Sequence, residues 1–248
     1  MLISVVHLER FFGVHPKGVL HVGAHEAEEL GDYVKHGWGN VAWVEMLPEK
    51  FEALQKRFAG DPSNLVFHAA CWDRDGETLP VHRADNGQAS SLLAPQYHLT
   101  AHPWVNFKQD EHILTSRLDT ILPAHLSFDF LNMDIQGAEL RALRGLGKRI
   151  EPVKWVFVEV NTKRLYADCA LVNELDDYLK PYGFQRFATM MYGRSGWGDA
   201  LYINTKSLSS FEIARLRVQS GVWFLTSIVR SYVLKKARKL RARYKFLA

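Results

Sequence analysis

The sequence predicts an α/β fold in which a mostly parallel sheet carries helices on both of its faces. Short apolar runs alternate with amphipathic stretches along most of the chain, as in parallel strands joined by helices. The runs 19–22 and 128–133 carry few polar residues, which is typical of strands buried on both faces. With 248 residues, 47% hydrophobic and 23% charged, the chain can form one full-size globular domain.

The predicted helices begin and end at residues that favour helix boundaries. Pro48 sets the first turn of one helix, and Gly147 and Gly183 each end another. The expected helices span 2–12, 26–36, 49–58, 138–146 and 170–182. The expected strands, besides the two runs above, span 41–45, 65–70, 78–82, 113–118, 155–160, 184–191 and 200–204.

Residues 83–112 show neither a helical nor a strand period. They contain several turn-forming and aromatic residues, and a loop of this length inside a compact domain is usually functional. We therefore expect this segment to cover the site at which a substrate binds.

A strand, a glycine and the expected start of a helix follow one another over residues 19–26. Gly23 comes directly after the strand, and this arrangement presents backbone N–H groups and a helix N-terminus to a ligand. Glu45 ends the next strand, roughly 20 residues after the glycine, where an acid can accept hydrogen bonds from a ribose diol. The opening third of the chain therefore predicts a nucleoside-cofactor site.

The segment 129–139 resembles the FkbM family of S-adenosylmethionine-dependent methyltransferases, in which Asp, a hydrophobic residue and Gln-Gly-Ala-Glu follow the fourth strand. Other segments resemble the same family in the same order, so that the similarity covers 18–204, most of the chain. These segments are Val22-Gly23-Ala24-His25, Glu45 ahead of Pro48, Ser90-Ser91-Leu92, Leu118-Asp119-Thr120-Ile121-Leu122, Glu159-Val160 and Gly196-Trp197-Gly198-Asp199-Ala200-Leu201-Tyr202.

The resemblance implies a Rossmann-like class I methyltransferase sheet with an antiparallel last strand, and S-adenosylmethionine as the cofactor. It implies methyl transfer to a hydroxyl oxygen of a small molecule, such as a sugar or a glycolipid. This chemistry needs in-line approach to the sulfonium methyl group, and a hydroxyl nucleophile benefits from a nearby base. Two positions depart from the family pattern: Ala27 or Glu28 stands where a second glycine is usual, and Met46 follows the ribose-binding acid in place of Pro.

The cofactor-binding residues that we expect follow the first three strands. Gly23 or Ala24 would approach the cofactor and Glu45 would bind its ribose, although a turn glycine and an acid at a solvated strand end also occur without a cofactor. The resemblance places the adenine beside Cys71 and Trp72. Cys71 could equally be a small buried apolar residue.

The catalytic residues that we expect are Asp134, Glu159 and His25. Asp134 follows the fourth strand, where the resemblance places the transferred methyl group; alternatively it caps the next helix. Glu159 could line the acceptor pocket, and His25 could serve as a base or a cofactor contact. The substrate-binding residues would be Ser90, Ser91, Gln136 and Asn161.

Three further acid-related features remain open. Glu139 stabilises the first turn of its helix or forms an ion pair, and Asp199 bonds loop backbone. Asp134 and Glu159 end neighbouring strands and could share a divalent cation. Nothing in the spacing requires this metal, and no His or Cys pattern typical of zinc is present.

The C-terminal segment differs from the rest of the chain in charge. Residues 210–248 hold ten Lys or Arg and one acid, Glu212, so residues 1–209 are net acidic although the whole chain carries +4. We therefore predict a methyltransferase domain over 1–209 and a basic amphipathic helical extension over 210–248.

This extension has the pattern of an interfacial anchor on anionic lipid. The apolar stretch 221–229 is too short to span a bilayer, and basic residues follow it, so residues 215–245 could contact a membrane surface. Alternatively, the helix packs its apolar part on the domain and solvates its charges. RNA binding is disfavoured because no recognition motif accompanies the basic residues.

The expected location is the cytoplasm, at the inner face of a membrane if the extension binds lipid. The two cysteines, Cys71 and Cys169, are far apart and form neither a disulfide framework nor a metal-binding spacing. Charged residues among the first 12 interrupt any signal-peptide core.

Two other function classes compete with methyl transfer. A nucleotide-dependent oxidoreductase could use a similar sheet, but the chain around Gly23 lacks the G-x-G-x-x-G fingerprint. A non-catalytic module could act through its basic extension. The joint presence of Gly23, Glu45 and Asp134 argues against a decayed site.

Overall fold

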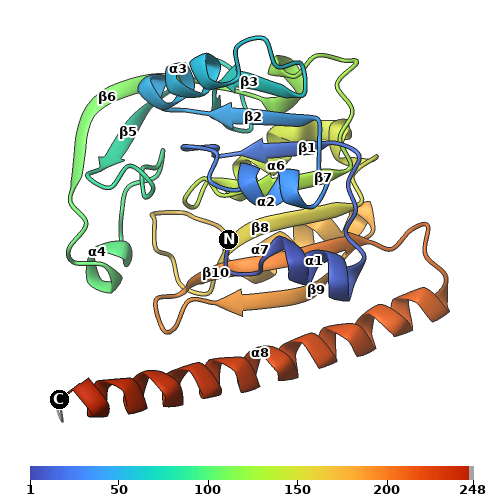
Figure 1. The fold of residues 1–248 in the computed structure, drawn as a ribbon. Helices are drawn as coiled ribbons and strands as arrows, with labels where there is room; N and C mark the ends of the chain where they lie inside the picture. Colours follow the sequence, from blue (N-terminus) through green and yellow to red (C-terminus); the bar gives the residue numbers. More distant parts are fainter. Residues whose placement is uncertain (246–248) are drawn as a thin grey trace.

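The computed structural model describes the backbone of residues 1–245 and the side chains of 1–108 and 111–227. A seven-stranded sheet with the order β3-β2-β1-β7-β8-β10-β9 forms the centre of the molecule (Figure 1). Its strands are β1 (Val19–Val22), β2 (Val41–Glu45), β3 (Asn64–His68), β7 (Phe130–Met133), β8 (Trp155–Asn161), β9 (Phe184–Met191) and β10 (Trp197–Asn204). The pairs from β3 to β8 are parallel, and β10 runs antiparallel to both of its neighbours. The predicted mostly parallel sheet with an antiparallel last strand is confirmed.

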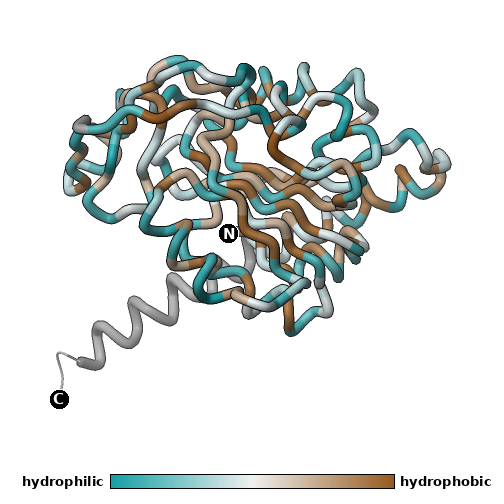
Figure 2. Tube along the Cα trace, turned by 90° about the horizontal axis from the view of Figure 1, so that it is seen from above, coloured by the Kyte–Doolittle hydropathy of each residue, from teal (hydrophilic) through white to brown (hydrophobic). Residues whose placement is uncertain are grey.

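Helices cover both faces of this sheet, as predicted. One apolar core joins the strands to α5 (Leu118–Ile121), α6 (Glu139–Leu146) and α7 (Val172–Leu179). The core on the other face joins them to α1 (Val5–Phe12), α2 (Leu30–Lys35), α3 (Pro48–Arg57) and α8 (Ser210–Lys245). Short 3-10 helices, η1 (Gly147–Ile150) and η2 (Lys180–Tyr182), follow α6 and α7. Figure 2 shows the hydrophobic strands inside this layered arrangement.

A second, smaller sheet lies beside the first and corrects two expectations. It pairs β4 (Ala70–Cys71) with β6 (Phe107–Ser116), and β6 with β5 (Thr78–Ala84). The third strand of the main sheet therefore ends at His68, because Ala70 and Cys71 pair with β6 instead. The region 83–112 is not one loop: β5 runs into it, α4 (His98–Ala101) lies within it, and β6 begins inside it.

The first crossover helix begins later than the sequence suggests. The expected start was residue 26, but α2 begins at Leu30. His25 and Ala27 adopt left-handed backbone conformations, with φ of 45° and 53°, and the Ala27 N–H donates to the Ala24 carbonyl at 2.7 Å. These turns separate Gly23 from the helix, so no helix N-terminus stands directly behind the glycine.

The C-terminal helix packs on the domain in its first part. There it contacts α1 and β9, and it then projects beyond the sheet (Figure 1). The basic residues from Arg230 onward, on which the lipid expectation rests, lie outside the described side chains. Among the described residues, no helix is long and apolar enough to cross a membrane.

Candidate active site

Two joined cavities lie at the carboxyl ends of the central strands. The larger has a volume of about 430 Å³ and the smaller about 60 Å³. Five residues line both: Gly23, His25, Gln88, Asp134 and Gln136. The predicted convergence of strand ends is therefore realised, with Glu45 on the small cavity and Glu159 on the large one.

Gly23 is required by the way the first turn packs. Its φ is 89°, and an added Cβ would lie 1.9 Å from the carbonyl oxygen of Asp134. The absence of a side chain thus lets the turn after β1 approach the end of β7. The N–H groups of Gly23 and Ala24 both donate to the Val44 carbonyl, at 2.9 and 3.0 Å. The expectation that this turn presents free backbone donors is wrong, because those donors hold β1 to β2.

Glu45 is a buried carboxylate that joins two loops. One oxygen accepts the N–H groups of Met46 and Leu47 at 2.9 and 2.8 Å, and the other accepts the His25 N–H at 2.7 Å. The side chain is 6% exposed and lines the small cavity. Since a carboxylate offers about four acceptor positions, Glu45 retains capacity for a hydroxyl of a ligand.

The remaining wall of the small cavity is mainly apolar. It includes Cys71, whose thiol has its pKa raised by burial. Trp72 lies next to this wall but does not line either cavity; the Arg141 guanidinium stacks over its ring at 5.2 Å. An apolar wall with one acid at its end suits a nucleoside, which has an apolar face and a ribose diol.

Asp134 and Glu159 are brought together by the side chain of Gln136. The Gln136 amide donates to Asp134 at 2.6 Å and to Glu159 at 3.1 Å, and its oxygen lies 2.8 Å from the Tyr166 hydroxyl. Gln136 itself has a left-handed backbone, with φ of 55°, next to Gly137. This strained turn aims its side chain across the ends of β7 and β8.

The two acids differ in their exposure to the large cavity. Asp134 is solvent-accessible at the floor of the cavity, whereas Glu159 is 5% exposed and one of its oxygens, Oε1, has no hydrogen-bond partner. Although Asp134 faces the cavity, its carboxyl lies among protein groups deep in the site, and the resulting loss of hydration raises its pKa. Burial and the neighbouring Asp134 carboxylate raise the pKa of Glu159 well above its ordinary value. Both carboxyls therefore hold protons more strongly than fully hydrated carboxyls do.

Glu139 stabilises the loop that follows Asp134. It is 1% exposed, and one oxygen accepts the N–H groups of Ile135 and Gly137 at 3.1 and 3.0 Å. Burial raises its pKa to about 7. Of the two roles considered for Glu139, stabilisation of the start of its helix is the one observed, since it closes the loop into α6.

The carboxylates of Asp134, Glu139 and Glu159 could hold a divalent cation. Each offers an oxygen, and these three atoms lie within 4.8 Å of one another. Oxygen ligands of this kind suit Mg²⁺ or Ca²⁺. The amide of Gln136 already donates to two of the three acids, so the same geometry also serves a cluster stabilised by hydrogen bonds and protons.

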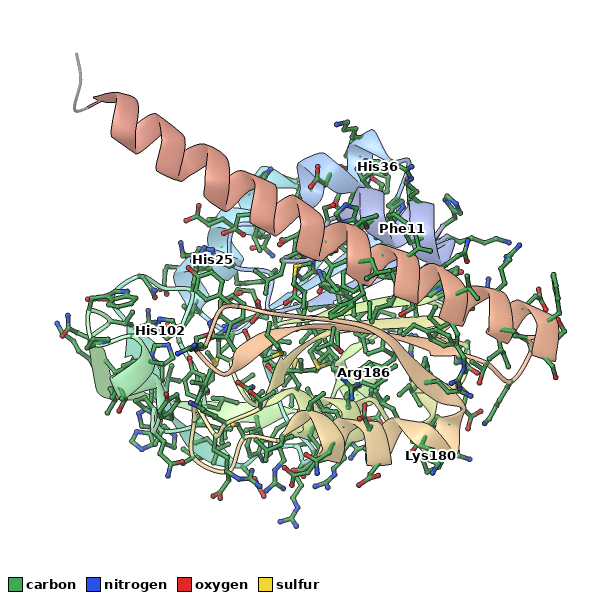
Figure 3. The ribbon with its side chains drawn as sticks, turned by 90° about the horizontal axis from the view of Figure 1, so that it is seen from below. Phe11, His25, His36, His102, Lys180 and Arg186 are labelled. Atoms are coloured by element: carbon green, nitrogen blue, oxygen red, sulfur yellow. The ribbon has the colours of Figure 1, made fainter. Side chains whose placement is uncertain are left out.

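His25 stands between the two cavities. Its Nδ1 is 2.6 Å from a carboxylate oxygen of Glu28, while its Nε2 is buried without a hydrogen-bond partner. A carboxylate that holds Nδ1–H leaves Nε2 as a proton acceptor. The structure thus provides two candidate bases, His25 and Asp134, that line the same space (Figure 3 labels His25).

The other predicted substrate residues have mixed positions. Ser90 lines the small cavity, and its hydroxyl oxygen accepts the Ala84 N–H at 3.1 Å. Ser91 is fully buried and donates to the Gln136 carbonyl at 2.7 Å. Asn161 is buried, lines neither cavity, and has no partner for its side-chain amide. Only Gln136 of the four reaches the large cavity.

Several lining residues of the large cavity were not predicted as site residues. His98, His102 and Trp104 come from α4 and the residues after it, and their rings contact one another in sequence. His102 lies at the same end of the molecule as His25 (Figure 3). Burial and the nearby His102 lower the pKa of His98 to about 4, so it is neutral at pH 7. Their aromatic residue types were visible in the sequence, but their position facing the strand ends was not.

The large cavity is acidic. Its lining includes five carboxylates and, among the described side chains, neither Lys nor Arg; the acids are Glu28, Glu29, Asp134, Glu159 and Asp199. Burial raises the pKa of Asp199 to about 6, and this carboxylate accepts the Leu2 N–H. The role expected for Asp199, bonding loop backbone, is observed. A cavity of this kind favours cationic or neutral hydroxyl-rich ligands over anions.

Known proteins resemble this chain in sequence and in fold. A family model described as the methyltransferase FkbM domain matches residues 21–186. The 2-O-methyltransferase NoeI of Sinorhizobium fredii (strain NBRC 101917 / NGR234) is 28% identical over 150 residues, which cover 57% of this chain and 60% of that protein.

Solved structures with a similar fold have low sequence identity. The ribosomal protein L11 methylase of Lactobacillus delbrueckii subsp. bulgaricus is 14% identical, with a TM-score of 0.47 and coverage of 82% of this chain and 77% of that one. The magnesium protoporphyrin IX methyltransferase ChlM of Synechocystis PCC 6803, solved with bound S-adenosylmethionine, is 11% identical, with a TM-score of 0.42 and coverage of 75% and 69%.

Proposed function

The chain belongs to the FkbM family of methyltransferases, with a Rossmann-like class I sheet, and we propose that it transfers a methyl group from S-adenosylmethionine to a hydroxyl of a sugar-containing acceptor. The observation that carries the proposal is the pair of joined cavities. One has a buried ribose-type acid, Glu45, and the other has a proton-binding acid, Asp134, at its floor. The matched relative is itself described as a 2-O-methyltransferase.

The small cavity would hold the nucleoside part of the cofactor. Glu45 would accept a ribose hydroxyl, and the apolar wall around Cys71 would face the adenine. Its volume of about 60 Å³ is below the range of about 300–1,000 Å³ usual for ligand pockets. Residues 87–92, which cover it and begin at a glycine with φ of 73°, would therefore move outward when the cofactor enters.

The large cavity would hold the acceptor next to Asp134. When bound, S-adenosylmethionine supplies an electrophilic methyl group on a positively charged sulfur. Asp134 accepts the proton of the acceptor hydroxyl, and its raised pKa makes it a stronger base than an exposed carboxylate. Gln136 positions Asp134 through the 2.6 Å hydrogen bond, and Tyr166 positions Gln136. The acidic lining also complements a positive sulfonium.

The same lining supports a neutral, hydroxyl-rich acceptor such as a sugar. An ionised carboxylate accepts hydrogen bonds but cannot donate them, so it pairs well with the hydroxyl groups of a sugar, which can donate. Trp104 and the neighbouring histidines provide flat aromatic surfaces in the same cavity. Phosphate or carboxylate close to the reacting hydroxyl would meet five acids and, among the described side chains of the cavity lining, neither Lys nor Arg.

Calorimetric titration with S-adenosylhomocysteine tests the cofactor part of the proposal. We expect binding by the wild-type protein and about 10- to 100-fold weaker binding by Glu45→Gln, because a charge-assisted hydrogen bond is lost. Glu49→Gln, an exposed acid on α3 that pairs with Arg83, is the matched control. Binding of NAD or NADP instead would replace methyl transfer with the oxidoreductase alternative.

The acceptor part is tested by transfer of labelled methyl from S-adenosylmethionine to neutral sugars and to the same sugars carrying phosphate. We expect neutral sugars to be methylated and their phosphorylated forms to react poorly. Preference for the phosphorylated forms would contradict the proposal that the acidic cavity selects neutral acceptors, but it would leave the cofactor assignment intact.

A further inference from the structure

The first part of α8 has one face that packs on the domain. Leu216 and Trp223 are 7% and 2% exposed, and the Trp223 ring meets that of Phe12 edge-on, with centroids 5.8 Å apart. Ser220, on the same face, donates to the carbonyl of Phe187. These contacts fix the helix against α1 and β9 and thereby fix which face points outward.

The outward face carries an apolar stripe that nothing in the described structure covers. It consists of Phe211, Val218, Val222 and Leu225, which are 77%, 67%, 47% and 64% exposed. Their spacing of seven, four and three residues places them on one side of a helix, opposite Leu216 and Trp223. Phe224 is also 54% exposed, so five of the thirteen large exposed apolar residues in the described chain lie on this short part of α8.

The charge that follows the stripe identifies the surface it fits. Residues 230–245 contain eight Lys or Arg and no Asp or Glu, and α8 runs on to Lys245. Two such segments side by side in a dimer of this chain would repel each other. A nucleic acid would attract the charges but would leave the apolar stripe in water. An anionic lipid surface accepts both, since apolar side chains enter the acyl boundary while basic side chains meet the head groups.

We infer that α8 is an interfacial helix that binds the protein to an anionic membrane surface through the stripe and the basic residues after it. The helix projects past the domain toward the side where α4 lies and where the central strands end (Figure 1). His25 and His102 lie at that same end (Figure 3). If the proposed methyl transfer holds, a sugar carried on a lipid would be presented on the side of the molecule that holds the cavities.

Vesicle flotation of the full chain, without cofactor or acceptor, tests this inference separately from the proposed function. The probes are vesicles of phosphatidylcholine alone and of phosphatidylcholine mixed with phosphatidylglycerol. We expect binding to the mixed vesicles, weakened by added salt because the head-group attraction is screened. Replacing Val218, Val222 and Leu225 together by Ser should weaken this binding about 100-fold, since three apolar side chains no longer enter the lipid.

A matched variant replaces Val34, Leu65 and Leu114 by Ser, because these exposed apolar residues lie off α8. It should float as the wild type does. The inference is overturned if the protein ignores anionic vesicles, or if the two triple variants bind equally well. A third outcome also overturns it. In that outcome the wild-type protein does not bind vesicles but forms a dimer by light scattering, and the stripe variant loses this dimer.

Discussion

The acids at the strand ends and the segment 84–106 line the same cavity but are held in different ways. Asp134 follows β7 and Glu159 lies near the end of β8, and the Gln136 amide donates to both carboxylates while Tyr166 bonds the oxygen of Gln136. Trp104, in the segment, is 70% exposed. We therefore expect a fixed floor, formed by these acids, to supply the chemistry and a more adaptable wall, formed by the exposed side chains of the segment, to select the acceptor.

The sharpest test of the fixed floor is Asp134→Asn. If Asp134 is the base, methyl transfer should fall about 10²- to 10⁴-fold while S-adenosylhomocysteine still binds, because the amide keeps the shape but cannot take a proton. Single-turnover rates and calorimetry measure the two effects. The control is Asp85→Asn, since Asp85 is an exposed acid of the segment that bonds to Asn106.

The pH dependence of the same reaction distinguishes the two candidate bases. Asp134 acts only when ionised, so the wild-type rate should rise with pH through an apparent pKa above the ordinary carboxyl value of 3.8. This apparent value belongs to the coupled pair with Glu159. Should His25→Asn remove the acidic limb of the profile and Asp134→Asn preserve it, His25 would be the base instead.

The second test measures how far Glu139 stabilises the floor. Glu139→Ala removes the acceptor of two buried N–H groups and should lower the free energy of unfolding by about 2–5 kcal/mol. Glu139→Gln keeps an acceptor oxygen, and it should be much less destabilised at neutral pH. Urea titrations of both variants against the wild type give the comparison, and equal stability of all three would contradict the structural role.

Glu139 also predicts the direction in which stability changes with pH. Its pKa in the folded protein is about 7, above the ordinary 4.5, so the folded state binds the proton more strongly than the unfolded state. Stability should therefore decrease as pH rises from 4.5 to about 7. Glu139→Gln should flatten this decrease only in part, because the pKa values of Asp134, Glu159 and Asp199 are also raised and those groups contribute a decrease of the same sign.

The sequence predicts the acids of the floor but not the position of the segment that forms the wall, and the reason is physical. Parallel strands bring their carboxyl ends to one edge, so strand order alone predicts that Glu45, Asp134 and Glu159 lie along the two cavities. The wall depends on long-range contacts, such as the N–H of Gln96 donating to the carbonyl of Leu165 at 2.8 Å. The turn after Gly23 also differs from the prediction, because the left-handed residues that follow are His25 and Ala27 rather than glycines.

The adaptable wall is tested by Trp104→Ala. We expect the KM of the acceptor to rise about 10-fold with little change in kcat, because an aromatic contact of about 1–1.5 kcal/mol is lost away from the reacting atoms. Stability should not change, since the side chain is exposed. Leu99→Ala is the control, as Leu99 lies on α4, is 51% exposed and lines neither cavity. A loss in kcat alone would assign Trp104 to the chemistry and end the division between floor and wall.

The smallest expected effect comes from chelation of divalent metal. Asp134, Glu139 and Glu159 are close enough to share a cation, but the amide of Gln136 and the N–H groups of Ile135 and Gly137 already compensate their charge. We therefore expect EDTA to change the methyl-transfer rate by less than about twofold, below the effect of losing one hydrogen bond. A large fall that Mg²⁺ restores would show that the floor is completed by a cation. In that case Glu159→Gln should abolish the response to Mg²⁺, because the buried, unpaired oxygen of Glu159 is the position at which a cation would bind.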